Sequence, residues 1–107
     1  MVKNCYLHLG LHKTASFSFQ QTCSRNINLL KSFNITYPYF TCSAANENLI
    51  TNHSIPIYSL LCKNPEEYHI NIKWNVSDQI KQVNKSYLEQ LEGYLEESNN
   101  IILSGED

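Results

Sequence analysis

Residues 6–21, YLHLGLHKTASFSFQQ, pass from an apolar run into a short turn and then into a segment with helical spacing. The run before Gly10 is rich in aliphatic and aromatic side chains, which predicts a strand over residues 5–9, central in a parallel sheet. From residue 15 to about residue 33, apolar side chains recur every three or four positions, which predicts a helix. A strand that enters a helix in this way restricts the fold to helices packed on a sheet.

The turn between this strand and this helix carries groups that bind anions. A helix N-terminus has backbone N–H groups without intrahelical partners and a partial positive charge. Lys13 adds a point charge, and the hydroxyls of Thr14, Ser16 and Ser18 can donate hydrogen bonds to phosphate oxygens. The sequence therefore predicts an anion-binding turn, although one of these hydroxyls caps the helix in either case.

The remaining chain contains a long predicted helix over residues 77–97, which has an apolar stripe, and a short apolar strand over residues 101–103. Residues 54–62 predict a short helix, and NPEE at 64–67 is typical of a helix start. Residues 39–51 are expected to form a loop or an irregular helix, and residues 68–75 fit a strand or a loop. The order of elements predicts an α/β fold with a short parallel sheet flanked by helices.

A length of 107 residues allows at most one small domain. Two strands and two main helices cover a sheet poorly, and the sheet edges need partners. We therefore expect residues 1–107 to be the N-terminal part of a larger domain. The four cysteines include no C-x-x-C pair, so a zinc ribbon is not expected, and Cys5 and Cys62 look like small core residues.

The net charge of −2 argues against a general binder of nucleic acid or membrane surfaces, but it leaves a small anionic ligand open. No apolar run reaches membrane-spanning length. The N-terminus does not read as a secretory signal, so a cytoplasmic location with reduced cysteines is expected. The four N-x-[ST] sequons, starting at residues 34, 52, 75 and 84, are then chance matches in an asparagine-rich chain.

The turn matches only the Lys-Thr end of the nucleotide-binding pattern G-x-x-x-x-G-K-[ST], because no glycine precedes Lys13 directly. Residues 8–16, HLGLHKTAS, resemble instead the 5′-phosphosulfate-binding loop of sulfotransferases that use 3′-phosphoadenylyl sulfate (PAPS), in the form usual in bacterial carbohydrate-type members. Gln20 matches the last position of that motif, and residues 101–106, IILSGE, resemble the second strand of the same family. Tyr37-Pro38 also fits the family's pattern after the first helix.

The resemblance implies a P-loop-like three-layer fold, of which this chain is a part, and transfer of a sulfuryl group from PAPS to a hydroxyl acceptor on a carbohydrate. It implies that Lys13 contacts the 5′-phosphosulfate and stabilises charge on the bridging oxygen, with no metal required. Ala15 stands where the family has glycine, and Phe17 where a hydroxyl residue is common. The implied donor-binding residues are His12, Lys13, Thr14, Ala15, Ser16, Phe17 and Ser18.

The acceptor hydroxyl needs a general base. Glu106 is the first candidate, because it follows a strand at the carboxyl edge where ligands bind in open α/β sheets. His53 and His12 are the other candidates. His8 lies within a strand and is expected to be packed.

Two other functions remain open from the sequence. A nucleotide kinase or other phosphotransferase would need a magnesium-binding aspartate after a later strand, and Asp107 is the one candidate. A non-catalytic remnant, which binds nucleotide weakly or pairs with another chain, is favoured by Ala15 and Phe17.

Overall fold

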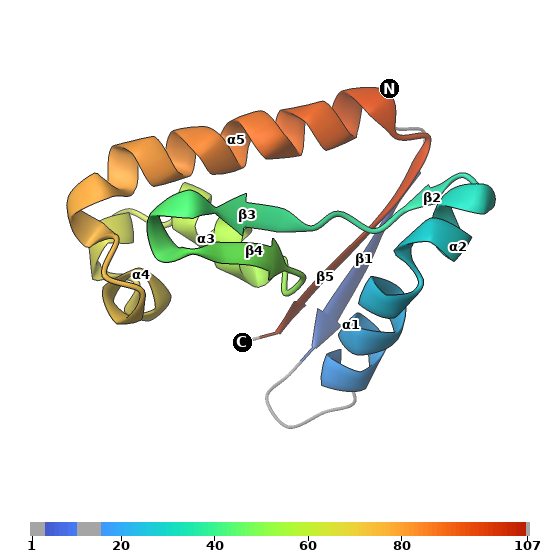
Figure 1. The fold of residues 1–107 in the computed structure, drawn as a ribbon, viewed down its shortest axis with the longest axis horizontal. Coiled ribbons are helices and arrows are strands. Elements are labelled where there is room, and N and C mark those ends of the chain that lie inside the picture. The colour runs from blue at the N-terminus through green and yellow to red at the C-terminus, as the bar shows by residue number, and fades with distance from the viewer. Residues whose placement is uncertain (1–3, 11–15, 107) are drawn as a thin grey trace.

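The structure is a computed structural model that describes the backbone of residues 4–10 and 16–106 and the side chains of residues 4–8 and 19–105. The described residues form both helices and strands (Figure 1). The strands are β1 (Asn4–Gly10), β2 (Ile35–Thr36), β3 (Phe40–Cys42), β4 (Glu47–Ile50) and β5 (Asn100–Glu106). The α-helices are α1 (Ser16–Arg25), α2 (Ile27–Ser32), α3 (Ser54–Leu61), α4 (His69–Lys73) and α5 (Ile80–Glu97). Three short 3₁₀ helices are η1 (Ser43–Ala45), η2 (Pro65–Glu67) and η3 (Ser77–Gln79).

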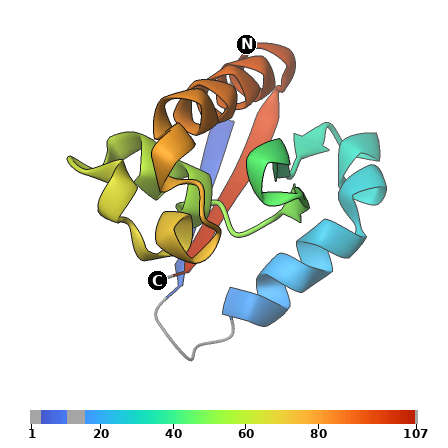
Figure 2. The ribbon, with the colours of Figure 1, turned by 60° about the vertical axis from the view of Figure 1, so that its left-hand side comes forward.

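Among the described residues, β1, β5 and β2 form a parallel sheet in that order. The register of β1 and β5 runs from Asn4 opposite Asn100 to Gly10 opposite Glu106. In Figure 2, α1 and α2 lie to one side of these strands, and α3, α4 and α5 lie to the other. The predicted α/β class, with a short parallel sheet between helices, is confirmed.

The predicted central position of the first strand is wrong, because β5 lies between β1 and β2. β1 is an edge strand of the described sheet, and it leaves Tyr6 57% and Leu7 64% exposed. Cys5 is exposed as well, and Cys62 is only half-buried, so neither is the core residue that its apolar neighbours predicted. An apolar run shows that a strand has hydrophobic faces, but not which strands will lie beside it.

The helix predicted over residues 15–33 is divided into α1 and α2 at Asn26. The Asn26 side-chain amide donates to the carbonyl of Thr22 at 2.7 Å, which competes with the helical pairing of the backbone. α2 then ends before Asn34, whose φ of 61° is left-handed. Phe33, at the end of the predicted helix, is 69% exposed, whereas Cys23 of α1 is buried.

Residues 39–51, expected to be a loop or an irregular helix, instead contain the antiparallel hairpin β3–η1–β4. Phe40 and Cys42 are buried on one face of β3, and Thr41 between them is exposed. Asn46 takes a left-handed conformation, with φ 55°, which lets the chain turn into β4. The alternation covers only three residues, too few to predict a strand before its packing partners are known.

Four further predictions are confirmed. The helix over residues 54–62 is α3, NPEE at 64–67 forms the N-cap and the whole of the short η2, and residues 77–97 form η3 and α5. The strand over residues 101–103 is also confirmed, and it extends to residues 100–106. Within residues 68–75, which fitted a strand or a loop, the structure has the short helix α4.

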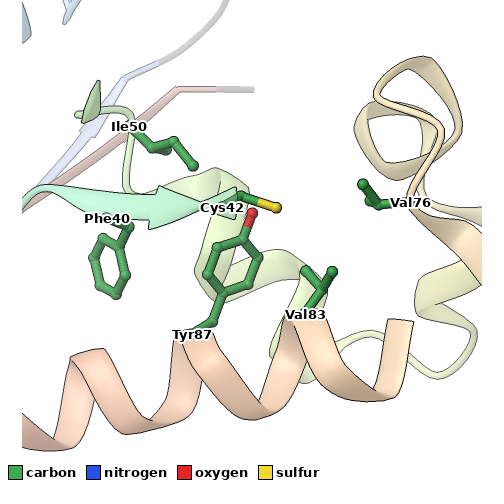
Figure 3. Packing of buried hydrophobic residues seen from close by; sticks show 6 residues of the cluster. All are labelled: Phe40, Cys42, Ile50, Val76, Val83 and Tyr87. Atoms are coloured by element: carbon green, nitrogen blue, oxygen red, sulfur yellow. The ribbon is translucent and has the colours of Figure 1, made fainter. Parts of the chain in front are cut away.

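The main apolar core lies between the hairpin and α5 rather than on the sheet (Figure 3). α5 contributes Val83 and Tyr87, which are spaced one helical turn apart. These side chains pack against the buried face of β3. The ring of Phe40 stands edge-on to the ring of Tyr87, with centroids 6.3 Å apart. The buried cluster comprises Phe40, Cys42, Ile50, Val76, Val83 and Tyr87.

Within the described ranges, no helix combines the length and the hydropathy that crossing a bilayer requires.

We expect Phe40→Ala to lower the free energy of unfolding by about 3–5 kcal/mol, because it empties the centre of this core. The matched change Phe33→Ala, at an exposed phenylalanine, should change it by less than about 0.5 kcal/mol. Urea unfolding followed by circular dichroism measures both. Equal losses at the two positions would contradict the described core.

Gly105 marks a close approach of β5 to the start of α3. A methyl group added there would lie 3.0 Å from Cβ of Ser54 and 3.3 Å from its backbone nitrogen. We expect Gly105→Ala to destabilise the protein by about 1–3 kcal/mol, because α3 would have to move. Gly93→Ala in α5, where an added methyl group would meet no atom beyond the adjacent residues and the backbone of the helix within 4 Å, should stabilise it by about 0.5–1 kcal/mol. Thermal melts of both variants measure these effects. An unchanged melting temperature in Gly105→Ala would contradict the close approach of Gly105 to Ser54.

Candidate functional site

The carboxyl ends of β1 and β5 lie side by side, with Leu9 opposite Gly105 and Gly10 opposite Glu106. α1 begins at Ser16, so residues 11–15 connect the end of β1 to the N-terminus of this helix. The strand-to-helix arrangement predicted around the anion-binding turn is therefore present. No acidic residue occupies the first turn of α1, so that turn carries no carboxylate to repel an anion.

The side chains of all seven predicted donor-binding residues lie outside what the structure describes. His12, Lys13, Thr14 and Ala15 fall outside the described residues. The backbone of Ser16, Phe17 and Ser18 forms the first turn of α1, but their side chains are not described. Their roles in binding a donor therefore stay predictions.

Glu106 ends β5 directly opposite Gly10, the residue that precedes the predicted anion-binding turn. Its backbone position therefore brings the candidate general base to the edge of the sheet at which the turn begins. The side chain of Glu106 lies outside the described part, so its role as a base stays a prediction.

Ser104, two residues before Glu106, is the centre of a buried polar cluster. Its hydroxyl oxygen lies 3.0 Å from Nδ1 of His8, and the Gln20 side-chain amide donates to it at 3.4 Å. One hydroxyl can serve both partners by donating to one and accepting from the other. Ser104 is fully buried and Gln20 is 5% exposed, while His8 stacks on Phe19 with centroids 4.2 Å apart. These contacts join β1, α1 and β5 beneath the candidate site.

His53, a sequence candidate for the general base, is tied into the same cluster and is 1% exposed. Its Nε2–H donates to the carbonyl of Pro38, and its Nδ1 accepts the backbone N–H of Ser104 at 2.8 Å. Burial lowers the pKa of His53 to about 4, although the hydrogen bond to the Pro38 carbonyl acts in the opposite direction. The ring is therefore neutral at pH 7 and both its nitrogens are engaged, which is the geometry of a structural histidine.

Tyr37 packs on the other side of His53, with ring centroids 4.6 Å apart. Its hydroxyl donates to the carbonyl of Thr51 at 2.8 Å. Burial raises the pKa of Tyr37, the neighbouring Cys23 adds to this effect, and a hydrogen bond with Ser104 opposes it. Tyr37 is thus a neutral phenol that holds the segment before α3 against the sheet.

The stretches that resemble the family include Gln20, Tyr37 and Ser104, but sequence reasoning did not predict that Ser104 is buried or that it pairs with His53. The only local sign of Ser104 is a polar residue in the apolar run IILSGE. Its partner His53 lies 51 residues away, so the pairing could not be deduced from spacing.

No group of three or more His, Cys, Asp or Glu side chains among the described residues is arranged to hold a metal ion. The described side chains near the carboxyl ends of β1 and β5 form a hydrogen-bonded polar cluster. The N-terminus of α1, which follows the turn, has backbone N–H groups of the kind that can bind an anion.

No protein-family model, curated protein or solved structure matches the chain.

The lowered pKa of His53 predicts that the stability of the protein depends on pH. The unfolded imidazole binds a proton below about pH 6.5, whereas the folded one does so only near pH 4. The unfolded state therefore binds more protons between these values, so stability falls as the pH is lowered from about 6.5 to about 4. The difference between the two pKa values corresponds to at most about 3 kcal/mol.

Urea unfolding between pH 7 and pH 4 should show this loss in the wild type and less of it in His53→Gln. NMR titration of the wild-type histidine rings is an independent check. A ring of His53 that titrates near pH 6.5 would contradict its buried, neutral state.

Proposed function

We propose that this chain carries the donor-binding part of a PAPS-dependent sulfotransferase, which transfers a sulfuryl group to a hydroxyl on a carbohydrate. The observation that carries the proposal is the register of β5 with β1. It brings the end of IILSGE, at Glu106, beside the start of the turn that holds HKTAS. The two stretches that resemble the family are thus neighbours in the fold, although they lie at opposite ends of the sequence.

The proposed donor site uses the N-terminus of α1. Its first backbone N–H groups have no intrahelical partners, and no carboxylate competes in the first turn. The backbone of Ser16, Phe17 and Ser18 would donate to the 5′-phosphate oxygens, together with the hydroxyls of Thr14, Ser16 and Ser18. Lys13 would neutralise the charge that grows on the bridging oxygen as the sulfuryl group leaves. Phe17 keeps its N–H for this purpose although it has no hydroxyl.

The proposed reaction is an in-line displacement at sulfur. The acceptor oxygen forms a new bond to sulfur, the bond from sulfur to the phosphate oxygen breaks, and adenosine 3′,5′-bisphosphate leaves. Glu106 would take the proton of the acceptor hydroxyl. The work of the protein is then positioning and charge neutralisation rather than covalent chemistry. We do not assign the base to His53, because its ring is buried and both nitrogens are hydrogen-bonded.

A second candidate function is nucleotide binding without catalysis. Ala15 replaces the glycine of the motif and Phe17 replaces a hydroxyl residue, and both changes weaken a donor site. A phosphotransferase has less support, because this chain has no glycine directly before Lys13. Its magnesium-binding candidate, Asp107, lies outside the described residues.

Calorimetric titration separates these functions. We expect adenosine 3′,5′-bisphosphate to bind more tightly than ATP with magnesium. Lys13→Ala should lower the affinity for the bisphosphate by about tenfold to a hundredfold, as expected for a lost charge-assisted hydrogen bond.

Lys81→Ala, an exposed lysine on α5, is the matched control and should leave the affinity unchanged. Tighter binding of ATP would contradict the sulfotransferase proposal. Binding of neither ligand would reject a donor site in this chain, and bisphosphate binding without sulfuryl transfer would favour the non-catalytic alternative.

A further inference from the structure

A cleft of about 300 Å³ lies between α1, β4, the start of α3 and Trp74. We call it the Trp74 cleft. Its wall combines the indole of Trp74 and the apolar side chains of Leu49 and Ile55 with the polar side chains of Gln20, Glu47 and Asn52. A volume of this size is at the lower end of the range for small-molecule sites. It suits a ligand of one or two sugar rings.

One wall of the Trp74 cleft contacts the end of β5 directly, and a second is linked to it through Ser54. Gln20 reaches from α1 to the hydroxyl of Ser104. Asn52 accepts hydrogen bonds from the backbone N–H and the hydroxyl of Ser54, at 3.2 and 2.8 Å, and Ser54 lies against Gly105. Ser104 and Gly105 directly precede Glu106. The cleft is therefore attached to the strand that carries the candidate base.

The composition of the wall fits a polyhydroxylated ring. An indole and aliphatic side chains pack on the C–H faces of a sugar, while amides and a carboxylate pair with its hydroxyls. A purely apolar ligand would displace water from the half-exposed carboxylate of Glu47 without replacing its hydrogen bonds, which costs free energy. The wall thus favours a ligand with apolar faces and several hydroxyls.

Glu47 is the one ionisable group among the described residues of this wall, and it is half-exposed. A carboxylate accepts hydrogen bonds from hydroxyls but repels a second negative charge. The described wall has no lysine, arginine or histidine to compensate a uronate or a sulfate on the ligand. The Glu47 carboxylate, which can orient a neutral sugar, is therefore expected to lower the affinity of the cleft for an anionic sugar.

We propose that the Trp74 cleft binds the acceptor, and that this acceptor is an uncharged saccharide rather than a uronate-bearing or already sulfated one. The role as acceptor rests on the proposed sulfotransferase function. The binding of a neutral sugar does not, because it follows from the wall of the cleft alone.

Trp74 is the single tryptophan of the chain, so its fluorescence reports on the cleft directly. The probes are cellobiose and cellobiouronic acid, which share a skeleton and differ by one carboxylate. We expect cellobiose to change the tryptophan emission and to bind at least about tenfold more tightly than the uronate. Saturation-transfer NMR with cellobiose provides a second readout that does not depend on emission. Absence of binding by both methods, or equal affinity for the two sugars, would overturn the proposal.

Glu47→Gln keeps the size of the side chain and removes its charge. We expect this variant to bind cellobiose within about threefold of the wild type and to lose most of its discrimination against the uronate. Glu92→Gln, an exposed position on α5, is the matched control and should keep the discrimination. Unchanged discrimination in Glu47→Gln would overturn the assignment of Glu47.

The two proposals fail in different ways. Binding of adenosine 3′,5′-bisphosphate without binding of cellobiose would reject the cleft and leave the donor site standing. Binding of cellobiose without binding of the bisphosphate would support a neutral-sugar cleft and reject its role as the acceptor site of a sulfotransferase.

Discussion

The parallel pairing of β1 with β5 joins segments that are 96 residues apart in the chain. Closing so long a loop costs conformational entropy, which buried contacts must offset. β5 supplies many of these contacts because it lies between β1 and β2, with Ile101 and Ser104 fully buried. α1 reaches it through Gln20, and the start of α3 lies against Gly105. Loss of β5 would therefore disrupt both the sheet and the candidate site.

The cluster around Ser104 shows how polar groups can stabilise a position that water does not reach. Buried polar atoms are costly unless they are paired, and the histidine and amide partners of Ser104 supply that pairing. Because His53 is neutral and saturated with hydrogen bonds, its role is to hold Pro38, the segment before α3 and β5 together. The cluster thus has a structural role, and the proposed chemistry is assigned to Lys13 and Glu106 instead.

The apolar core and the candidate site occupy different parts of the molecule. The core lies under the hairpin and α5, around Phe40 and Tyr87 (Figure 3). The candidate site lies at the carboxyl end of β1 and β5, where polar side chains gather. The Trp74 cleft connects the two, because Trp74 and Ile55 pack against the core while Gln20 belongs to the Ser104 cluster. Substitutions of Trp74 or Ile55 would therefore affect both the core and the cleft.

The sequence by itself determined the α/β class, the long helix α5, the two main strands and the strand-to-helix turn, because hydrophobic period and turn chemistry are local properties. Only the tertiary structure decided that β5 is central, that Phe40 begins a hairpin, and that Ser104 meets His53. Strand order, burial and the partners of polar side chains depend on segments far apart in the chain. For the same reason, a histidine that looked like a candidate base in the sequence is a buried, neutral support in the fold.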